Sequence, residues 1–134
     1  MAADGLKTIK SGYGPADTID RLEAELSARG MTVFARIDHA AGAAAVGLAL
    51  RPTVVLIFGN AKAGTPLMQA AQTVGLDLPL KILVWQDAAG STWTSYNDPA
   101  WLAKRHALGP EVLAALRAMA AVLEAITRAT ASAQ

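Results

Sequence analysis

The chain of 134 residues has no cysteine at all, and this absence removes several classes of function. Without thiols there is no disulfide framework, no thiolate nucleophile, and no zinc or iron–sulfur site built on cysteine. Aromatic residues are also scarce, at 5%, although hydrophobic residues reach 53%. The apolar excess therefore comes from small and aliphatic side chains, which favour helices and a packed core over disorder.

The chain also has no large excess of charge of either sign, because 12 Lys and Arg residues nearly balance 11 Asp and Glu residues. The chain lacks the basic excess with which proteins neutralise a phosphate backbone, so no nucleic-acid partner is expected. The most apolar stretch, residues 39–50, is about half the length that a bilayer crossing needs, so no membrane partner is expected. Asp4, Gly5 and Lys7 stand where a signal peptide has its apolar core, which favours a cytoplasmic protein.

The length fits one domain over residues 1–134, with a core of about residues 6–127 and a frayed tail at 128–134. Periodicity and turn residues predict strands at 6–11, 31–38, 53–58, 80–85 and 92–96, with helices at about 15–29, 40–49, 65–75, 98–105 and 110–127. The third strand is a continuous apolar run, which predicts burial on both faces. A tight turn at 87–90 makes the last two strands a hairpin and places Trp85 opposite Trp93.

The order of these elements favours an α+β fold with a mainly antiparallel sheet and helices packed on one face. The hairpin fixes one antiparallel pair, and the other strand connections are short for parallel crossovers. The core is therefore expected to carry extra short helices and to end in a long C-terminal helix. Asp38 is expected to end the second strand and to cap the short helix that follows.

The segment Gly59–Thr65 is the first candidate site, because it follows a buried strand and precedes a helix. We expect a loop over residues 60–64 and a helix that begins with Thr65 as its cap. A nucleotide-binding P-loop has lysine directly before its final serine or threonine, whereas this chain has Gly64 there and Lys62 two residues earlier. Lys62, with Gly59, Asn60 and the free N–H groups of the helix start, predicts a small-anion site for a carboxylate or phosphate. The alternative interpretation is a turn that needs glycine only for its backbone.

The two histidines offer other chemistry. Asp38 and His39 end the second strand, and His106 follows the last strand. If the fold brings His39 and His106 together with the thioether of Met68, they could bind a transition metal or haem. A third possibility is a hydrolase or isomerase with His39 as its base, although no serine lies in a nucleophile-elbow context. Capping, surface and buried hydrogen-bonding roles for each histidine remain the plainer alternatives.

An ordered set of short motifs carries a family resemblance from about Leu6 to Leu108. The motifs are Thr18-Ile19 with Leu22, Val33-Phe34, Asp38-His39-Ala40-Ala41, Gly47-Leu48, Pro52-Thr53, Ile57-Phe58-Gly59-Asn60, Lys62-Ala63-Gly64-Thr65, Asp77-Leu78-Pro79-Leu80-Lys81 and Tyr96-Asn97-Asp98-Pro99. Together they resemble the domain of unknown function 302 family. One departure is Ala61, where the family usually has proline.

The resemblance implies a fold similar to the TATA-binding-protein saddle: a strand, a helix, four strands and a helix, often in a homodimer. It implies no established activity and identifies no cofactor. Together with the residues, it leads us to expect a cytoplasmic, non-enzymatic domain that dimerises through its sheet or a helix. That domain is expected to bind a small, possibly anionic ligand near Gly59–Thr65, with Asp38, His39 and His106 as polar contributors.

Overall fold

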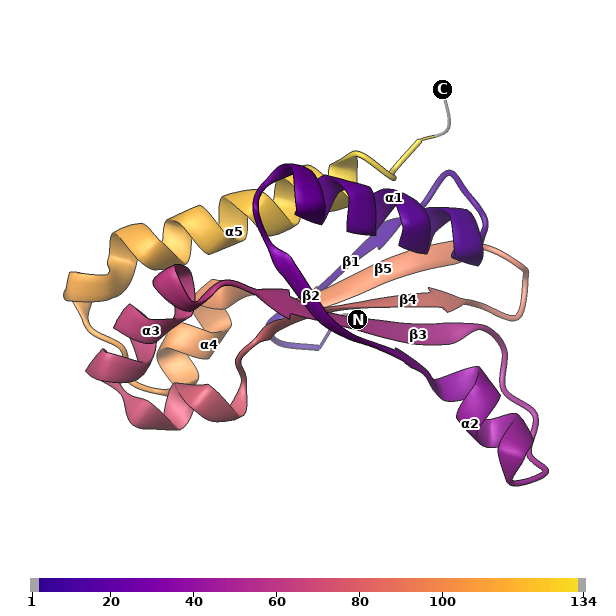
Figure 1. Ribbon diagram of the computed structural model, residues 1–134, viewed down its shortest axis with the longest axis horizontal. Coiled ribbons are helices and arrows are strands. Elements are labelled where there is room, and N and C mark those ends of the chain that lie inside the picture. The colour runs from indigo at the N-terminus through magenta and orange to yellow at the C-terminus, as the bar shows by residue number, and fades with distance from the viewer. Residues whose placement is uncertain (1–2, 133–134) are drawn as a thin grey trace.

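The computed structural model describes residues 3–132, which form a five-stranded antiparallel sheet with accompanying helices (Figure 1). The strands lie in the order β1-β5-β4-β3-β2, so β1 and β2 are the two edges. All four neighbouring pairs are antiparallel. The strands are β1 (Leu6–Lys10), β2 (Thr32–Asp38), β3 (Thr53–Gly59), β4 (Leu80–Gln86) and β5 (Thr92–Asn97). The predicted α+β class is confirmed.

Two long helices, α1 (Pro15–Ala28) and α5 (Leu113–Arg128), cover the same face of the sheet (Figure 1). Their apolar stripes pack against the sheet and form the core. The core residues that are wholly enclosed include Leu22, Leu26, Leu56, Phe58, Ile82, Leu123 and Ile126. The chain thus runs through a strand, a helix, four strands and a helix, as the resemblance implies.

Short helices lie at both ends of the sheet. Helix α2 (His39–Ala45) projects from one end, whereas α3 (Ala61–Ala70), the 3-10 helix η1 (Gln72–Leu76) and α4 (Pro99–Arg105) gather at the other (Figure 1). A second 3-10 helix, η2 (Pro110–Val112), leads into α5. The side chains of Asp38, Asn60 and Asp98 cap α2, α3 and α4 respectively, each accepting a backbone N–H bond of 2.9–3.0 Å. The predicted cap at Asp38 is confirmed.

Strand β3 is buried on one face only, so the prediction of burial on both faces is wrong. Val54, Leu56 and Phe58 point into the core, whereas Val55 and Ile57 between them are half-buried on the opposite face. A continuous apolar run indicates a doubly covered strand only where helices cover both faces, as in parallel sheets. Here α1 and α5 leave the second face, which we call the open face, without a long helix.

The predicted hairpin is confirmed. β4 and β5 pair with Trp85 opposite Trp93, and the two indole rings stack with centroids 6.1 Å apart. Trp85 donates its N–H to the hydroxyl of Ser95, and Trp93 donates to the carboxylate of Asp87 in the turn. That bond from Trp93 holds the pKa of Asp87 below its ordinary value. The indole pair therefore fixes both the register of the hairpin and its turn.

The chain after Thr127 is ordered as far as Ser132, so the expected frayed tail is wrong for these residues; the last two lie outside the described part. Thr130 is fully buried. Its carbonyl accepts the N–H of Gly12 at 2.8 Å and the hydroxyl of Ser11 at 3.1 Å. A tail of small polar residues suggested fraying, but these long-range bonds attach it to the end of β1.

We predict that Ser11→Ala lowers the free energy of unfolding by about 1–3 kcal/mol, because Ser11 is the centre of this attachment. Its buried hydroxyl contacts Thr18 Oγ1 at 2.6 Å and also accepts the N–H of Tyr13. Urea unfolding measures the change, and Ser27→Ala on the exposed face of α1 is the matched control. Equal stability of the two variants would contradict the prediction.

Candidate functional site

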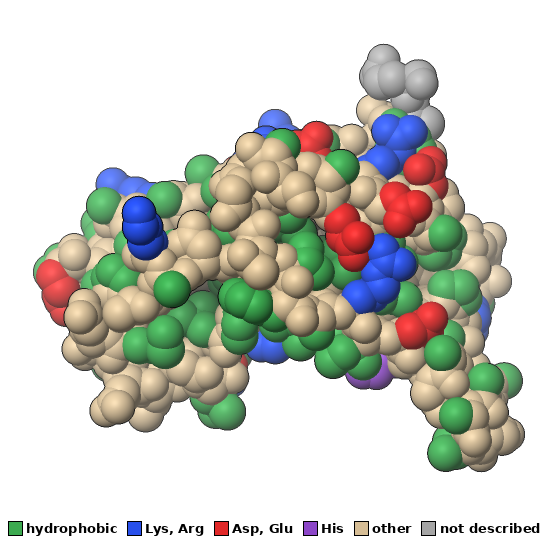
Figure 2. All heavy atoms as spheres, viewed as in Figure 1, with side chains coloured by type: hydrophobic (Ala, Val, Ile, Leu, Met, Phe, Trp, Pro, Cys, Tyr) green, Lys and Arg blue, Asp and Glu red, His purple; other side chains and the backbone are tan. Residues whose placement is uncertain are grey.

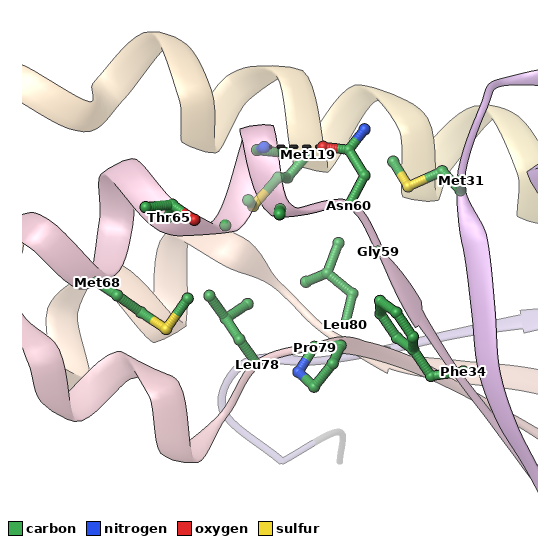
Figure 3. A pocket seen from close by; sticks show the side chains of 13 residues that line it. Met31, Phe34, Gly59, Asn60, Thr65, Met68, Leu78, Pro79, Leu80 and Met119 are labelled. Carbon is green, nitrogen blue, oxygen red and sulfur yellow. Dashed lines mark hydrogen bonds between the residues drawn. The ribbon is translucent and has the colours of Figure 1, made fainter.

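A cavity lies at the end of the sheet where β3 ends and β4 begins (Figure 3). Its volume is about 330 Å³, and it is partly open to solvent. We call it the end pocket. Its 13 lining residues are Met31, Phe34, Gly59, Asn60, Ala61, Ala63, Gly64, Thr65, Met68, Leu78, Pro79, Leu80 and Met119. Four of the predicted anion-site residues therefore line one pocket, namely Gly59, Asn60, Gly64 and Thr65, together with Met68 of the predicted metal site.

The backbone of this segment differs from the prediction. Residues 61–65 are not a loop followed by a helix that starts at Thr65; they are the first turns of α3. Asn60 is the cap, and its side-chain oxygen accepts the N–H of Ala63 at 2.9 Å. Pro66 therefore sits inside the helix, where its ring leaves the carbonyl of Lys62 without the usual bond. Asn60 and Thr65 are both good cap residues, and α3 begins after Asn60. Leu67 of this helix is buried in the core.

The lining of the end pocket is apolar. Three thioethers, from Met31, Met68 and Met119, come from three separate parts of the chain and converge on it (Figure 3). Asn60 and Thr65 supply the polar side chains among the 13 lining residues, and no charged side chain is among them. Flexible thioethers adapt to the shape of an apolar guest, whereas the amide and hydroxyl groups can orient one polar end.

Lys62, which we expected to contribute a positive charge, is not among the lining residues. It is an exposed residue in the first turn of α3. The site therefore contains the predicted glycines and polar groups without the predicted cation. The neighbours of Gly64 are apolar: a methyl group placed there would lie 3.6 Å from Leu78 and 3.8 Å from Met68.

Asp38 and His39 lie away from the pocket. β2 and β3 are antiparallel, so Thr32 pairs with Gly59 at the pocket end, and Asp38 pairs with Val54 at the other end. Asp38 uses its carboxylate to cap α2, and His39 is an exposed residue in the first turn of that helix. The structure does not bring these two residues together with the predicted anion-site residues.

His106 lies at the pocket end, within a cluster that the sequence did not indicate. Its Nε2 lies 2.5 Å from the carboxylate of Asp77, and its Nδ1 lies 2.9 Å from the hydroxyl of Thr73. Arg105 approaches the same carboxylate at 3.5 Å. The imidazole is 6% exposed. These bonds join η1 to the C-terminal end of α4, and the sequence could not reveal them because His106 lies 29 residues from Asp77 and 33 from Thr73.

A hydroxyl, an imidazole and a carboxylate in this order share the pattern of a nucleophile, a base and an orienting acid. The hollow beside Asp77, however, has a volume of about 10 Å³, roughly the space of one water molecule. Neither Thr73 nor His106 lines this hollow, and a structural role in joining η1 to α4 explains the contacts of the cluster.

The structure also does not assemble the predicted metal site. His39 lies at the α2 end of the sheet, His106 lies at the opposite end, and Met68 points into the end pocket. Within residues 3–132, no group of three His, Cys, Asp or Glu side chains is placed to hold a metal ion. None of the helices in this part of the chain is both long enough and apolar enough to cross a membrane.

The curated proteins that the chain matches are longer than the chain itself. The chain is 48% identical over 124 residues to "Fluoride-specific ion channel FluC 1" of Brucella suis biovar 1 (strain 1330), a match of 92% of this chain and 49% of that protein. It is equally similar to "Fluoride-specific ion channel FluC 2" of Brucella melitensis biotype 1, covering 46% of that protein. The chain thus spans about half the length of the curated relatives it matches.

Comparison with solved structures confirms the fold. The crystal structure of the uncharacterized conserved protein DUF302 from Bacillus stearothermophilus superposes with a TM-score of 0.85 at 24% identity, covering 96% of this chain and 99% of that one. The family described as Domain of unknown function DUF302 matches residues 7–126. That match covers most of the chain and includes β2 to β5, all of β1 but its first residue, and the end pocket, so the chain belongs to the DUF302 family.

Proposed function

We propose that the chain is a cytoplasmic, non-enzymatic domain that binds a small, largely apolar and uncharged ligand in the end pocket. The observation that carries this proposal is the pocket itself: about 330 Å³ of space lined by three methionines, Phe34 and Leu78 among others. This volume falls within the usual range for small-molecule sites, which are mostly apolar with a few polar groups.

The pocket leaves apolar side chains without packing partners. Interiors are packed nearly as densely as organic crystals, and an unfilled apolar cavity lowers stability in proportion to its volume. Three flexible methionines line this cavity and do not fill it. A guest that occupies the space would recover the lost contacts, and thioethers adapt to several guest shapes. The lining therefore supports a ligand site better than it supports a defect in packing.

The polar groups suggest how the ligand is oriented. Asn60 uses its amide oxygen to cap α3, which leaves its amide nitrogen as a donor. Thr65 offers a hydroxyl that can donate or accept. A carbonyl or hydroxyl at one end of an otherwise apolar molecule matches this pair. A carboxylate or phosphate would lose hydrating water on entering the pocket. No cationic side chain would compensate this cost, because Lys62 does not line the pocket. These contacts favour a neutral ligand over the anion expected from the sequence.

The names of the relatives support a second candidate role, which is association with an ion channel. Identity of 48% extends over nearly all of this chain but about half of each relative. We propose that this domain acts beside a channel in such proteins, where ligand binding in the end pocket would be its contribution. Fluoride itself is a small, strongly hydrated anion, and the uncharged lining of the pocket gives it little compensation for lost water.

The end pocket is tested with two related fluorescent probes, neutral phenylnaphthylamine and its anionic analogue anilinonaphthalene sulfonate. We expect the neutral probe to bind more tightly. Gly64→Leu should weaken its binding by about tenfold or more, because the new side chain would extend between Leu78 and Met68 into the cavity. Fluorescence titration gives both dissociation constants.

Two variants control this experiment. Ala24→Leu adds the same kind of bulk to the exposed face of α1 and should leave probe binding unchanged. Lys62→Ala should also leave the neutral probe unaffected. Tighter binding of the sulfonate, lost in Lys62→Ala, would instead support the anion site; equal binding by Gly64→Leu and the wild type would remove the end pocket as the site.

The channel role is separated from fluoride binding by fluorine NMR of sodium fluoride with the purified domain. We expect the position and width of the fluoride signal to be the same with and without protein, at matched ionic strength. A broadened signal that sodium chloride does not sharpen would mean that the domain itself binds fluoride, and would contradict the assignment of a neutral ligand.

A further inference from the structure

One apolar segment of the chain is almost wholly exposed. Residues 39–50, which comprise α2 and the stretch after it, contain no Lys, Arg, Asp or Glu, and ten of the twelve are exposed. Val46, Leu48 and Leu50 are 73%, 66% and 50% exposed. We call this segment the apolar arm. Figure 2 shows it projecting from the body with hydrophobic side chains at its tip. Monomeric proteins seldom expose a contiguous apolar surface of this kind.

The strand that leads into the arm is exposed as well. β2 forms an edge of the sheet, and its side chains Phe34 and Ile37 are 55% and 43% exposed. The other edge, β1, carries Lys7 and Lys10, and lysines on an edge strand discourage pairing with another chain. β2 has a bulge at Phe34, after which residues 35–38 form a regular free edge. β1 is thus better protected than β2 against pairing with the strand of another chain.

We propose that β2 pairs antiparallel with β2 of a second copy of this chain, with Ile37 opposite the partner's Ile37. The sheet would then continue across a two-fold axis, and both free edges would gain backbone hydrogen bonds. Ile37 projects from the open face, so the two isoleucines would contact one another at the axis.

Charge complementarity selects this register. With Ile37 opposite itself, Arg36 faces the partner's Asp38, and the symmetry repeats this pair of opposite charges on the other side of the axis. Arg36 and Asp38 share the face of the sheet on which α1 lies, because they pair with the core residues Leu56 and Val54. Directly opposed charges of opposite sign stabilise an antiparallel pair, and like charges destabilise it.

Each side chain retains one atom for this contact. Arg36 binds Glu23 and Asp20 of α1 through Nε and Nη2, which leaves Nη1 for a partner. The bond to Glu23 raises the pKa of Arg36 above its ordinary value, so its charge is permanent. Asp38 caps α2 through Oδ1 and retains Oδ2.

The antiparallel direction also determines where the arm goes. The partner's strand runs toward the pocket end of β2 and ends at its Asp38, opposite Arg36. The partner's arm therefore begins beside Ala35 and continues past Phe34 toward Met31. Phe34 and Met31 line the end pocket. The arm of each copy would therefore cover apolar surface at the mouth of the other's pocket. This role of the arm rests on the proposed ligand-binding function; the dimer does not.

A cysteine cross-link tests the register directly, because the chain has no cysteine of its own. Opposed residues in an antiparallel pair have Cα atoms about 4.5–5.5 Å apart, within the range that a disulfide spans. Ile37→Cys should therefore form a covalent dimer under mild oxidation, seen on a non-reducing gel. Leu6→Cys on β1 is the matched control, since Leu6 is 42% exposed, and this variant should form no cross-link and run as a single chain on the same gel.

Charge exchange provides a second measurement by light scattering. Arg36→Glu and Asp38→Lys should each weaken the dimer by about tenfold or more, because each places like charges opposite one another twice. The double variant should recover much of that loss. Circular dichroism confirms that each variant is folded.

Three results would overturn the proposal: a wild-type chain that is monomeric at submillimolar concentration, equal cross-linking by Ile37→Cys and Leu6→Cys, or additive losses in the double charge variant. None of these readouts involves a ligand. If only the probe titration fails, the proposal of a ligand site in the end pocket is wrong and the proposed dimer is unaffected. If only the cross-link fails, the proposed dimer is wrong and the ligand site is unaffected.

Discussion

The two long helices cover one face of the sheet, although β3 is apolar on both faces, and the rest of the structure depends on this imbalance. Leu56 and Phe58 reach the core under α1 and α5, whereas Val55 and Ile57, from the same strand, remain half-buried. Ring stacking of Trp85 and Trp93, with the bond from Trp85 to Ser95, shields part of the open face. The edge next to β3 has no such protection, which is why the exposed apolar surface collects at β2 and the apolar arm.

The end pocket follows from the way β3 leaves the sheet. Asn60 caps α3 directly after the strand, so the helix turns away from the sheet before β4 begins, and the space between them is bounded by side chains from α5 and β2 as well. Four separate parts of the chain must therefore be in place for the pocket to exist. Methionines supply much of the lining, and their flexibility lets these parts meet without filling the space.

Sequence patterns predicted the structural features that depend on residues close together in the sequence. The α+β class, the Trp85–Trp93 hairpin and the cap at Asp38 all follow from local spacing and are confirmed. The start of α3 was missed because Asn60 and Thr65 are both good cap residues and spacing alone does not choose between them. The contacts of the tail were missed because Ser11 and Gly12, which bind Thr130, lie more than 110 residues away in the chain. The candidate site shows the same division. Its position at Gly59–Thr65 was indicated, but its apolar character comes from Met31, Met119 and Leu78, which no local pattern connects to it.

The pocket and the arm stand at opposite ends of the same strand, about 20 Å apart over the six intervals of β2. Within one copy, the arm therefore cannot reach the pocket. An antiparallel two-fold relation reverses the direction of the second strand and brings each arm to the other copy's pocket, whereas a parallel one would leave both arms together. A ligand held between pocket and arm would then bind the assembled form more tightly than the separate chains. By thermodynamic linkage, such a ligand must strengthen the association by the same factor by which association strengthens its binding. Ligand binding and dimerisation would thus both depend on the exposed edge of the sheet at β2.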